Sequence, residues 1–414
     1  MRLRLLKKNF IVFLVILIVF IMLFYSIKRT KEDTNVVVTE KDSTQATVLM
    51  GKFEYSNIQD MRKFIYDSNY KQFIHNRDKF PLEPEMVVVV QVHNRPAYLK
   101  MLIQSLEKVI GIQNTLLIFS HDYFSEEISD VVKGITFCRV LQIYFPYSTQ
   151  LYPNEFPGQD PRDCPRDISK EDAIKKGCLN AAHPDSYGHY REASITQTKH
   201  HWWWKLHFVF ERVRVLLGYN GYVVFIEEDN YLLPDFHTYF KSMTELRKTS
   251  CGDCDVLALG NHNGLSGFHE FSSKTETTSW LSTKHNIGMG ISRELYYKLM
   301  GCNNAFCTYD DYNWDWTLQN LSGTCISKPL KVLVARGSRV LHTGDCGLHQ
   351  KEDCRPEMAQ ERVDSALKEA HSALFPPALT LTDHGAVEHH PHQKNGGWGD
   401  VRDHTLCINY AARL

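Results

Sequence analysis

The chain has 414 residues and carries 47 lysines and arginines against 48 aspartates and glutamates, for a formal net charge of -1. This balance argues against a nucleic-acid-binding protein that works mainly through charge. Hydrophobic residues make up 43% and charged residues 23%, proportions that allow a large core and exclude global disorder. The eleven cysteines are many for a cytosolic enzyme, and because the number is odd, at least one thiol is free or pairs outside the chain.

An apolar segment near the N-terminus determines the expected compartment. Residues 10–27 (FIVFLVILIVFIMLFYSI) form an uncharged run close to the ~20 residues that span a bilayer as a helix. No small-residue cleavage site follows it, and basic residues flank it with a slight excess on the N-terminal side. The pattern predicts an uncleaved transmembrane signal anchor, with residues 1–9 in the cytosol and the cysteines in an oxidising lumen.

Beyond the anchor, the composition separates a spacer from a folded unit. Residues 28–84 are polar and lack sustained periodicity, which predicts a stem. Residues 85–414 show neither a second compositional break nor an internal repeat, so we expect a single luminal domain there.

Strand and helix patterns alternate within this domain. Short apolar, β-branched runs predict buried strands at residues 86–92, 115–120, 140–145, 222–226 and 256–260. Helical spacing follows the first strand over residues 98–106, and residues 200–217 also predict a helix. The alternation predicts an α/β fold with a mostly parallel sheet, in which ligands bind beyond the carboxyl ends of the strands.

The carboxylates Glu227, Glu228 and Asp229 directly follow one of these strands. Crowded carboxylates repel one another and raise each other's pKa, so a cation is their natural partner. A solvated acidic turn is the alternative. His342 follows another apolar segment, and although a lone histidine is more often structural, imidazole would complement carboxylates around a manganese-type ion.

Aspartates and basic residues in three other segments are further candidates. In residues 309–320, a helix would place Asp311 and Asp315 on one face, although surface acids on a core helix would give the same pattern. Arg95 follows the first strand, and Lys199 and His200 lie near the start of the helix predicted at 200–217; all three could meet an anionic ligand. The tryptophans at 202–204 suit either core packing or a sugar-stacking platform.

Several long strings carry a family resemblance, in order from about residue 85 to the C-terminus. They are VVQVHNRPAYL, IFSHDY, LYPNEFPGQDPRDCPRD, ITQTKHHWWWKLHF, FIEEDNYLLPDF, FCTYDDYNWDWTLQ, HTGDCG and KNGGWGDVRDH. Together they resemble the N-acetylglucosaminyltransferase II family of Golgi enzymes, which have a GT-A fold. The resemblance implies a type II Golgi membrane protein that transfers GlcNAc, with inversion, from UDP-GlcNAc to the 2-OH of the α1,6-arm mannose as hybrid N-glycans mature to complex ones.

The resemblance also implies roles for individual residues. Asp229 and His342 would bind Mn²⁺, and Asp315 would be the catalytic base. The residues expected to bind the nucleotide are Gln91, Val92, His93, Asn94, Arg95 and Asp122. Those expected along the donor or acceptor are Gln197, Thr198, Lys199, His200 and His201, while Asp185 and Trp314 would help to seat the glycan.

Chemical logic favours a transferase over a hydrolase, because a diphosphate leaving group needs no general acid and a single base then suffices. A catalytically inactive luminal lectin and the sister enzyme of the α1,3 arm remain alternative functions. A homodimer is a candidate assembly. One loop departs from the family pattern: residues 261–270 (NHNGLSGFHE) contain no arginine. This departure leaves open how the loop contacts the acceptor.

The resemblance further implies five disulfides: Cys164 with Cys178, Cys251 with Cys254, Cys302 with Cys325, Cys307 with Cys407, and Cys346 with Cys354. Cys138 would then be a buried, inert thiol. The motif at Asn320 matches an N-glycosylation acceptor, but it adjoins the proposed catalytic helix.

Overall fold

The computed structural model describes residues 57–81, 83–262, 267–344 and 355–413, which belong to one compact unit. The strands are β1 (Ile74–His75), β2 (Met86–Val92), β3 (Thr115–His121), β4 (Arg139–Tyr144), β5 (Val223–Glu227), β6 (Asn230–Leu232), β7 (Val256–Ala258), β8 (Lys274–Ser279), β9 (Met289–Ile291), β10 (Lys331–Ala335), β11 (Val340–His342) and β12 (Thr380–His384). The α-helices are α2 (Ile58–Lys71), α3 (Pro96–Glu107), α4 (Glu126–Lys133), α5 (Lys170–Lys176), α6 (Ala193–His207), α7 (Phe236–Ser250), α8 (Phe268–Phe271), α9 (Ser282–His285), α10 (Arg293–Gly301), α11 (Asn303–Thr308), α12 (Trp314–Thr324), α13 (Pro356–Ala370) and α14 (Val401–Arg413).

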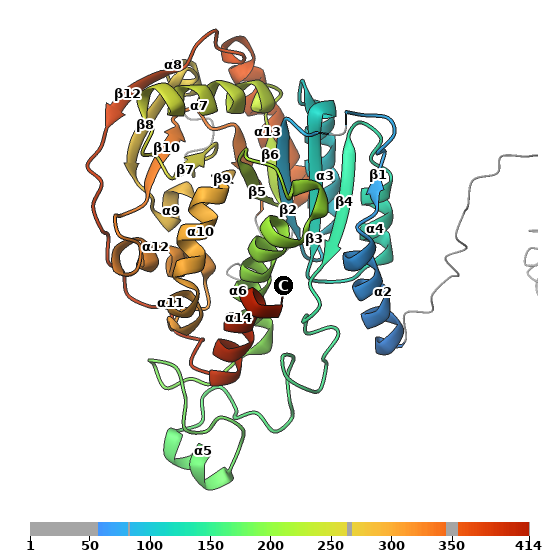
Figure 1. Ribbon diagram of the computed structural model, residues 1–414, viewed down its shortest axis with the longest axis vertical. Helices are drawn as coiled ribbons and strands as arrows, with labels where there is room; N and C mark the ends of the chain where they lie inside the picture. The colour runs from blue at the N-terminus through green and yellow to red at the C-terminus, as the bar shows by residue number, and fades with distance from the viewer. Residues whose placement is uncertain (1–56, 82, 263–266, 345–354, 414) are drawn as a thin grey trace, which may run out of the picture. The chain divides into compact units, whose positions relative to one another are not determined.

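Ten of the strands form one sheet, in the order β1-β4-β3-β2-β5-β9-β7-β10-β8-β12 (Figure 1). Strands β4, β3, β2 and β5 are mutually parallel, while β9 runs antiparallel to its neighbours β5 and β7. Strands β6 and β11 pair separately as an antiparallel ribbon. The five predicted strands are confirmed to within two residues at each end. The predicted α/β fold with a mostly parallel sheet is also confirmed.

Both faces of the sheet are buried. Along β2, Val87 and Val89 contribute to one apolar cluster, whereas Met86, Val88 and Val90 contribute to a second one. The first cluster includes residues of α6, α10, α12 and α14, and the second includes residues of α3, α4 and α7. Alternate side chains of a strand point to opposite faces, so a continuous β-branched run is stable only between two helical layers.

The folded unit begins earlier than the sequence predicts. Helix α2 lies within the expected stem (residues 28–84), yet it buries Met61 and Ile65 beside β4. Strand β1 follows and pairs with the edge of the sheet. The helix was missed because only these two of its residues are buried, which leaves a weak periodic signal.

The helix expected at 200–217 is displaced in the structure. Helix α6 begins seven residues earlier, at Ala193, and ends at His207. The chain continues as a π turn over Phe208–Arg212 (η2) and a 3₁₀ turn over Arg214–Leu216 (η3). The guanidinium of Arg293 donates to the backbone oxygens of Phe210 and Leu216, so a distant side chain satisfies carbonyls that a continuous helix would have paired.

Four of the five expected disulfides are present: Cys164–Cys178, Cys251–Cys254, Cys302–Cys325 and Cys307–Cys407. The fifth, Cys346–Cys354, lies outside the described residues. Cys138 is free and buried, as predicted, and burial raises the pKa of its thiol. Among the described residues, no helix is long and apolar enough to cross a membrane, and the anchor expected at 10–27 also lies outside them.

Candidate active site

The carboxyl ends of β2, β3 and β5 meet at one edge of the sheet. Gln91 on β2 lies in register between Ser120 on β3 and Glu227 on β5, because the three strands are adjacent and parallel. Val92 itself is buried in the core, and its backbone oxygen accepts a hydrogen bond from the Asp122 amide. The turns that follow these strands therefore converge where an open α/β sheet binds its ligands.

Arg95 joins the first turn to the acidic turn after β5. Its Nε donates to Glu228 Oε1 over 2.8 Å, and its Nη1 donates to Asp229 Oδ2 over 2.7 Å. The backbone amide of His93 donates to Glu228 Oε2. Glu228 and Asp229 are only 1% and 2% exposed, so the interpretation as a solvated acidic turn is wrong. Instead, these carboxylates form a buried, partly neutralised group.

Asp229 and His342 suit a divalent cation. Strand β11 pairs with β6 so that His342 is opposite Asn230, and His342 Nε2 lies 3.4 Å from Asp229 Oδ2. Asp229 Oδ1 is buried and has no hydrogen-bond partner within the described part of the chain. Burial raises the pKa of Asp229, but hydrogen bonds from His342 and Arg95 outweigh it, so the net shift is downward. An ionised carboxylate beside an imidazole is a donor set that manganese accepts.

Gly344 lies against the same carboxylate. A Cβ at this position would approach Asp229 Oδ2 more closely than real Cβ atoms approach other atoms. The glycine in the HTGDCG segment therefore allows the chain after His342 to close over Asp229.

Asp315 lies at the N-terminal end of α12, which begins one residue earlier. Its Oδ1 accepts from the Trp316 amide over 2.9 Å, and its Oδ2 accepts from Asn286 Nδ2 over 3.1 Å. Burial, reinforced by the negative charges of Glu227 and Asp311, raises the pKa of Asp315 to about 6. A carboxylate with this pKa is ionised at neutral pH and can still accept a proton effectively, as a general base must.

Asp311 is not on the same helix as Asp315, so the predicted i, i+4 pair is wrong. It precedes α12, and its carboxylate accepts from the backbone and side-chain amides of both Asn313 and Asn395. Its role is to fix the chain before the helix.

The expected nucleotide-binding residues gather at the sheet edge. His93 Nδ1 lies 2.6 Å from Asp122 Oδ1, and both His93 and Asn94 are exposed at the surface. Lys205 Nζ donates to Gln91 Oε1 over 2.7 Å from beneath. Lys205 is fully buried, and burial lowers its pKa. The sequence analysis did not single out this lysine, because in the sequence it is only the polar residue that follows three tryptophans.

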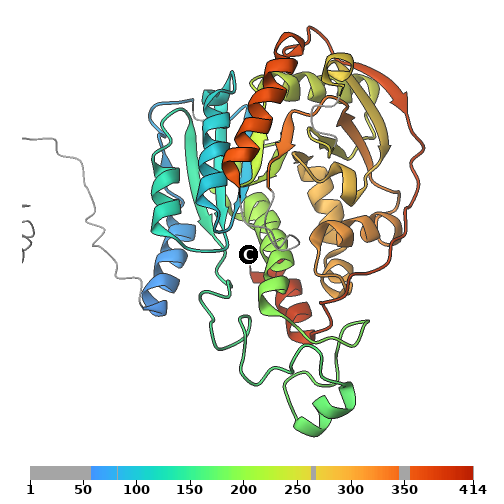
Figure 2. The ribbon, with the colours of Figure 1, turned by 180° about the vertical axis from the view of Figure 1, so that it is seen from behind.

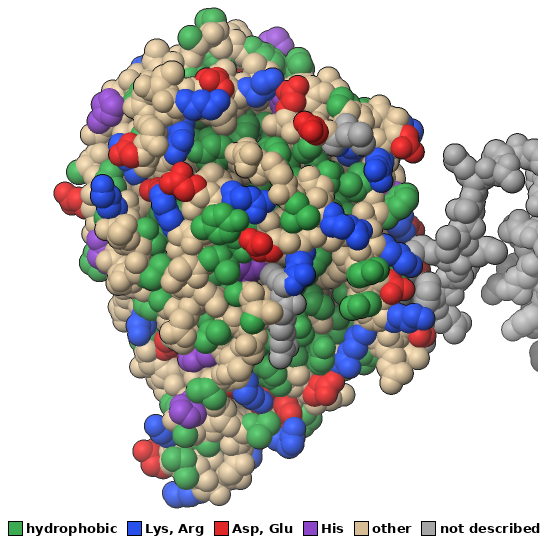
Figure 3. All heavy atoms as spheres, viewed as in Figure 1, with side chains coloured by type: hydrophobic (Ala, Val, Ile, Leu, Met, Phe, Trp, Pro, Cys, Tyr) green, Lys and Arg blue, Asp and Glu red, His purple; other side chains and the backbone are tan. Residues whose placement is uncertain are grey.

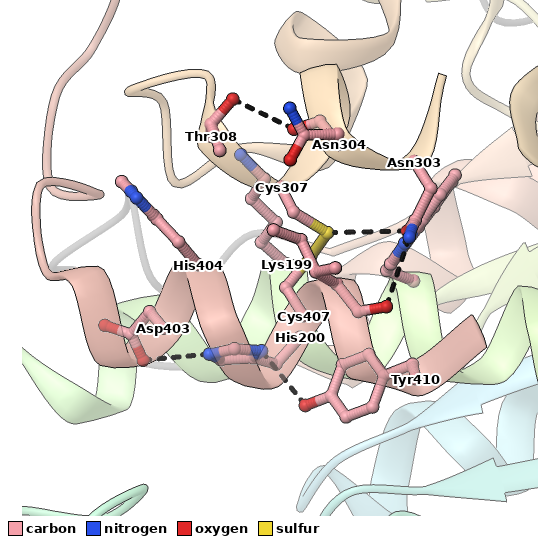
Figure 4. Close-up of a disulfide and its surroundings, with 12 residues drawn as sticks. Lys199, His200, Asn303, Asn304, Cys307, Thr308, Asp403, His404, Cys407 and Tyr410 are labelled. Carbon is pink, nitrogen blue, oxygen red and sulfur yellow. Dashed lines mark hydrogen bonds and ion pairs between the residues drawn. A yellow bond between two sulfur atoms is a disulfide. The ribbon is translucent and has the colours of Figure 1, made fainter. Parts of the chain in front are cut away.

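Residues 197–201 of α6 face the protein interior. Lys199 donates to the backbone oxygens of Tyr309 and Asp311, and His200 lies between Asp403 and Tyr410 of α14 (Figure 4). Both side chains are at most 2% exposed. They attach α14 and the chain before α12 to α6, and Figure 2 shows α14 lying against α6. The expectation that Lys199 and His200 meet a ligand is not supported by this placement.

The other members of that segment are also internal. Gln197 Oε1 accepts from the Thr149 amide, and Thr198 Oγ1 donates to a backbone oxygen of its own helix. His201 Nε2 lies 2.8 Å from Ser120 Oγ. The tryptophans at 202–204 are at most 3% exposed, which confirms core packing and excludes an exposed stacking platform.

Asp185 and Trp314 fix the C-terminal glycine-rich turn and the start of α12, respectively. Asp185 Oδ1 accepts from the amides of Tyr187 and His189, and its Oδ2 accepts from the amide of Gly397. Asp185 therefore joins its own loop to the glycine-rich C-terminal turn. Trp314 stacks on buried Trp202 at 4.3 Å between ring centroids, which fixes the start of α12.

The surface agrees with the balanced composition. On the face in Figure 3, basic and acidic side chains are interspersed. A ligand's negative charge would thus have to be met locally, within the site, without a broad basic surface.

Comparison with known proteins identifies the family. The family model of N-acetylglucosaminyltransferase II (MGAT2) matches residues 62–407. Curated relatives named alpha-1,6-mannosyl-glycoprotein 2-beta-N-acetylglucosaminyltransferase include those of Sus scrofa (52% identical, covering 84% of this chain and 79% of the relative) and Arabidopsis thaliana (32%, covering 81% and 77%). A solved mannosyltransferase from Pyrobaculum calidifontis, in complex with GDP-Man and Mn²⁺, is 10% identical with a TM-score of 0.31 over 77% of this chain and 82% of that one. The family match and the identities show that the chain is a glycosyltransferase and belongs to the N-acetylglucosaminyltransferase II family.

Proposed function

We propose that the protein transfers GlcNAc from UDP-GlcNAc to the 2-OH of the α1,6-arm mannose of N-glycans, with inversion and with Mn²⁺ as cofactor. The observation that carries the proposal is the combination of a buried Asp229 that lies beside the exposed imidazole of His342, as a metal-ligand pair would, with a separate carboxylate of raised pKa, Asp315. The relatives' names supply the acceptor arm and the sugar.

Asp229 and His342 would hold the metal ion, which would neutralise charge on the departing diphosphate. Arg95 keeps Glu228 and Asp229 in place through a hydrogen bond to each carboxylate. His93, exposed after the end of β2 and joined to the buried Asp122 after β3, offers a polar side chain for the nucleotide at the surface.

Asp315 would accept the proton of the acceptor hydroxyl as that oxygen attacks the anomeric carbon. The bond from this carbon to the diphosphate breaks on the opposite face, so the configuration inverts. No second carboxylate is needed, because a diphosphate leaves without being protonated. This arrangement favours a transferase over a glycosidase.

The test is transfer by the full-length protein in detergent, with Mn²⁺, UDP-GlcNAc and a glycan that already carries GlcNAc on the α1,3 arm. We expect one GlcNAc on the 2-OH of the α1,6-arm mannose, with β configuration by NMR. With a second acceptor whose α1,3-arm mannose is free, transfer to that arm would instead indicate the sister activity, and binding of either glycan without product would indicate a lectin.

We also propose that the protein is a single-pass type II protein of the Golgi membrane, anchored by residues 10–27. The apolar run and its basic flanks support this orientation. Protease treatment of intact microsomes is the test: residues 85–414 should be protected, and their digestion without detergent would contradict the proposal.

A further inference from the structure

A chain of hydrogen bonds leads from the surface to the candidate base. Asn286 Nδ2 donates to Asp315 Oδ2, and His262 Nε2 lies 3.1 Å from Asn286 Oδ1. Asp315 and Asn286 are half-buried, whereas His262 is exposed. The three residues belong to separate segments: α12, the end of α9 and the connection that follows β7.

The order of donors and acceptors follows from the carboxylate end. An ionised carboxylate can only accept, so the amide nitrogen of Asn286 must face Asp315 and the amide oxygen must face His262. His262 then donates from Nε2. Reversing the amide would place its oxygen against the carboxylate and lose a hydrogen bond there, so Asp315 sets the amide orientation and His262, by donating to Oδ1, supports it.

The backbone on both sides of Asn286 is held firmly. The amide and hydroxyl of Ser282, at the start of α9, both donate to Gln319 Oε1 on α12. Trp280 Nε1 donates to the backbone oxygen of His285. Helices α9 and α12 are thus fixed to each other, and the principal freedom left at Asn286 is rotation of its side chain.

His262 is held by its neighbour. The Asn261 amide donates to Ser338 Oγ over 3.0 Å, and Asn261 Nδ2 donates to the backbone oxygen of Ala335 over 3.2 Å. His262 also lines a cavity of about 250 Å³ together with His342. The imidazole therefore shares this cavity with the proposed metal ligand and also contacts Asn286, which contacts the base.

We propose that Asn286 and His262 are positioning residues: Asn286 directs the carboxylate of Asp315 toward the acceptor hydroxyl, and His262 fixes the amide of Asn286. The proposal rests on the proposed function. His262 belongs to the 261–270 segment that departs from the family pattern, so the outer link is expected to be particular to this chain.

The first test is Asn286→Ala. Losing the orientation of the base should lower kcat roughly 10²-fold and leave KM for UDP-GlcNAc unchanged. The Asn286 hydrogen bond favours the charged carboxylate, so its loss should raise the pKa of Asp315 and move the acid limb of the kcat profile to higher pH. Glu227 and Asp311, the other charges near Asp315, are unaltered in this variant.

The second test uses the exposed position, where folding is not at risk. His262→Phe removes the donor and should lower kcat roughly 2–10-fold, the effect of one exposed hydrogen bond. His262→Gln keeps an N–H donor and should retain most of the activity. His384→Gln, at an exposed position of β12, is the matched control and should behave as the wild type.

A double-mutant cycle decides whether the two residues act in series. If His262 works through Asn286, adding His262→Phe to Asn286→Ala should cause no further loss of kcat. Additive losses, or a His262→Phe variant as active as wild type, would overturn this inference while the wild type still transfers GlcNAc. A wild type that transfers none overturns the proposed function as well.

Discussion

Two buried carboxylates, Asp403 and Asp229, serve different purposes in the two regions that contain them. Asp403 is fully buried, and its oxygens pair with Arg191 Nε at 2.7 Å and with His200 Nε2 at 2.9 Å. Asp229 is 2% exposed, yet its Oδ1 has no hydrogen-bond partner among the described residues. A fully paired carboxylate holds elements together, whereas one with a free buried oxygen is arranged for a ligand.

The largest expected effect on activity comes from Asp315, which belongs with Asp229 to the candidate active site. Asp315→Asn removes the base, so turnover should fall roughly 10²–10⁴-fold. The amide is nearly isosteric, and UDP should still bind in the presence of Mn²⁺ when measured by calorimetry. Asp383→Asn, at an exposed position of β12, is the control. Transfer by Asp315→Asn at the wild-type rate would exclude Asp315 as the base.

The complementary change in the structural region is Asp403→Ala. It would leave the buried His200 without its carboxylate and the buried Arg191 with only the more distant Asp163, at 3.9 Å, and the free energy of unfolding should fall by about 3–5 kcal/mol. Denaturant titration of the full-length protein measures it. Asp130→Ala, which removes an exposed ion pair with Lys133, should cost at most about 0.5 kcal/mol. Equal losses in the two variants would contradict the distinction between paired buried and exposed carboxylates.

The pH dependence of that stabilisation has a defined sign. Burial raises the pKa of Asp403, but Arg191 and His200 lower it by more, so that the net pKa is about 2. A carboxyl group whose pKa is depressed on folding contributes stability above its unfolded pKa, and this stability is lost as the pH falls through the folded value. The Asp403 contribution should therefore be complete at neutral pH and disappear only in strong acid.

A smaller effect is expected at Gly344, where a side chain would press on Asp229. Gly344→Ala should displace this carboxylate and weaken Mn²⁺ binding by roughly 10–100-fold, the range seen when the surroundings of metal ligands are changed. Electron paramagnetic resonance of free Mn²⁺ measures the affinity without requiring turnover. Gly218→Ala, where an added Cβ meets nothing within 4 Å, is the matched control. An unchanged affinity in Gly344→Ala would remove support for Asp229 as a ligand.

The difference between the two regions also explains what could be predicted from the sequence. Buried strands such as β2 were predictable because β-branched runs signal burial on both faces. The position of Asp229 beyond β5 follows from the strand that precedes it, whereas His342 ends β11, a strand that we did not predict. Such features depend on local sequence patterns, and the structure confirms what these patterns predict.

The errors arose where the deciding partner is far away in sequence. Lys199 and His200 lie in a basic run that suggests an anion site, but the partner of His200 is Asp403, which is 203 positions away. Similarly, backbone carbonyls in the helical turns after α6 accept hydrogen bonds from Arg293, which is 77 or more residues away. Neither contact has a local signature, so only the folded chain reveals it.

The pH profile of turnover gives the finest test of the difference between structural and active-site carboxylates. Asp315 must be ionised to accept a proton, and its pKa is raised to about 6, so kcat should fall as the pH drops below about 6. Profiles recorded at saturating UDP-GlcNAc and Mn²⁺ separate this ionisation from donor binding, whose own titration would enter KM. Asp315→Glu should keep an acid limb, whereas the residual activity of Asp315→Asn should lack it. An acid limb near pH 4, the ordinary range of an exposed carboxyl, would mean that Asp315 is solvated in the working enzyme and belongs to neither kind of buried carboxylate.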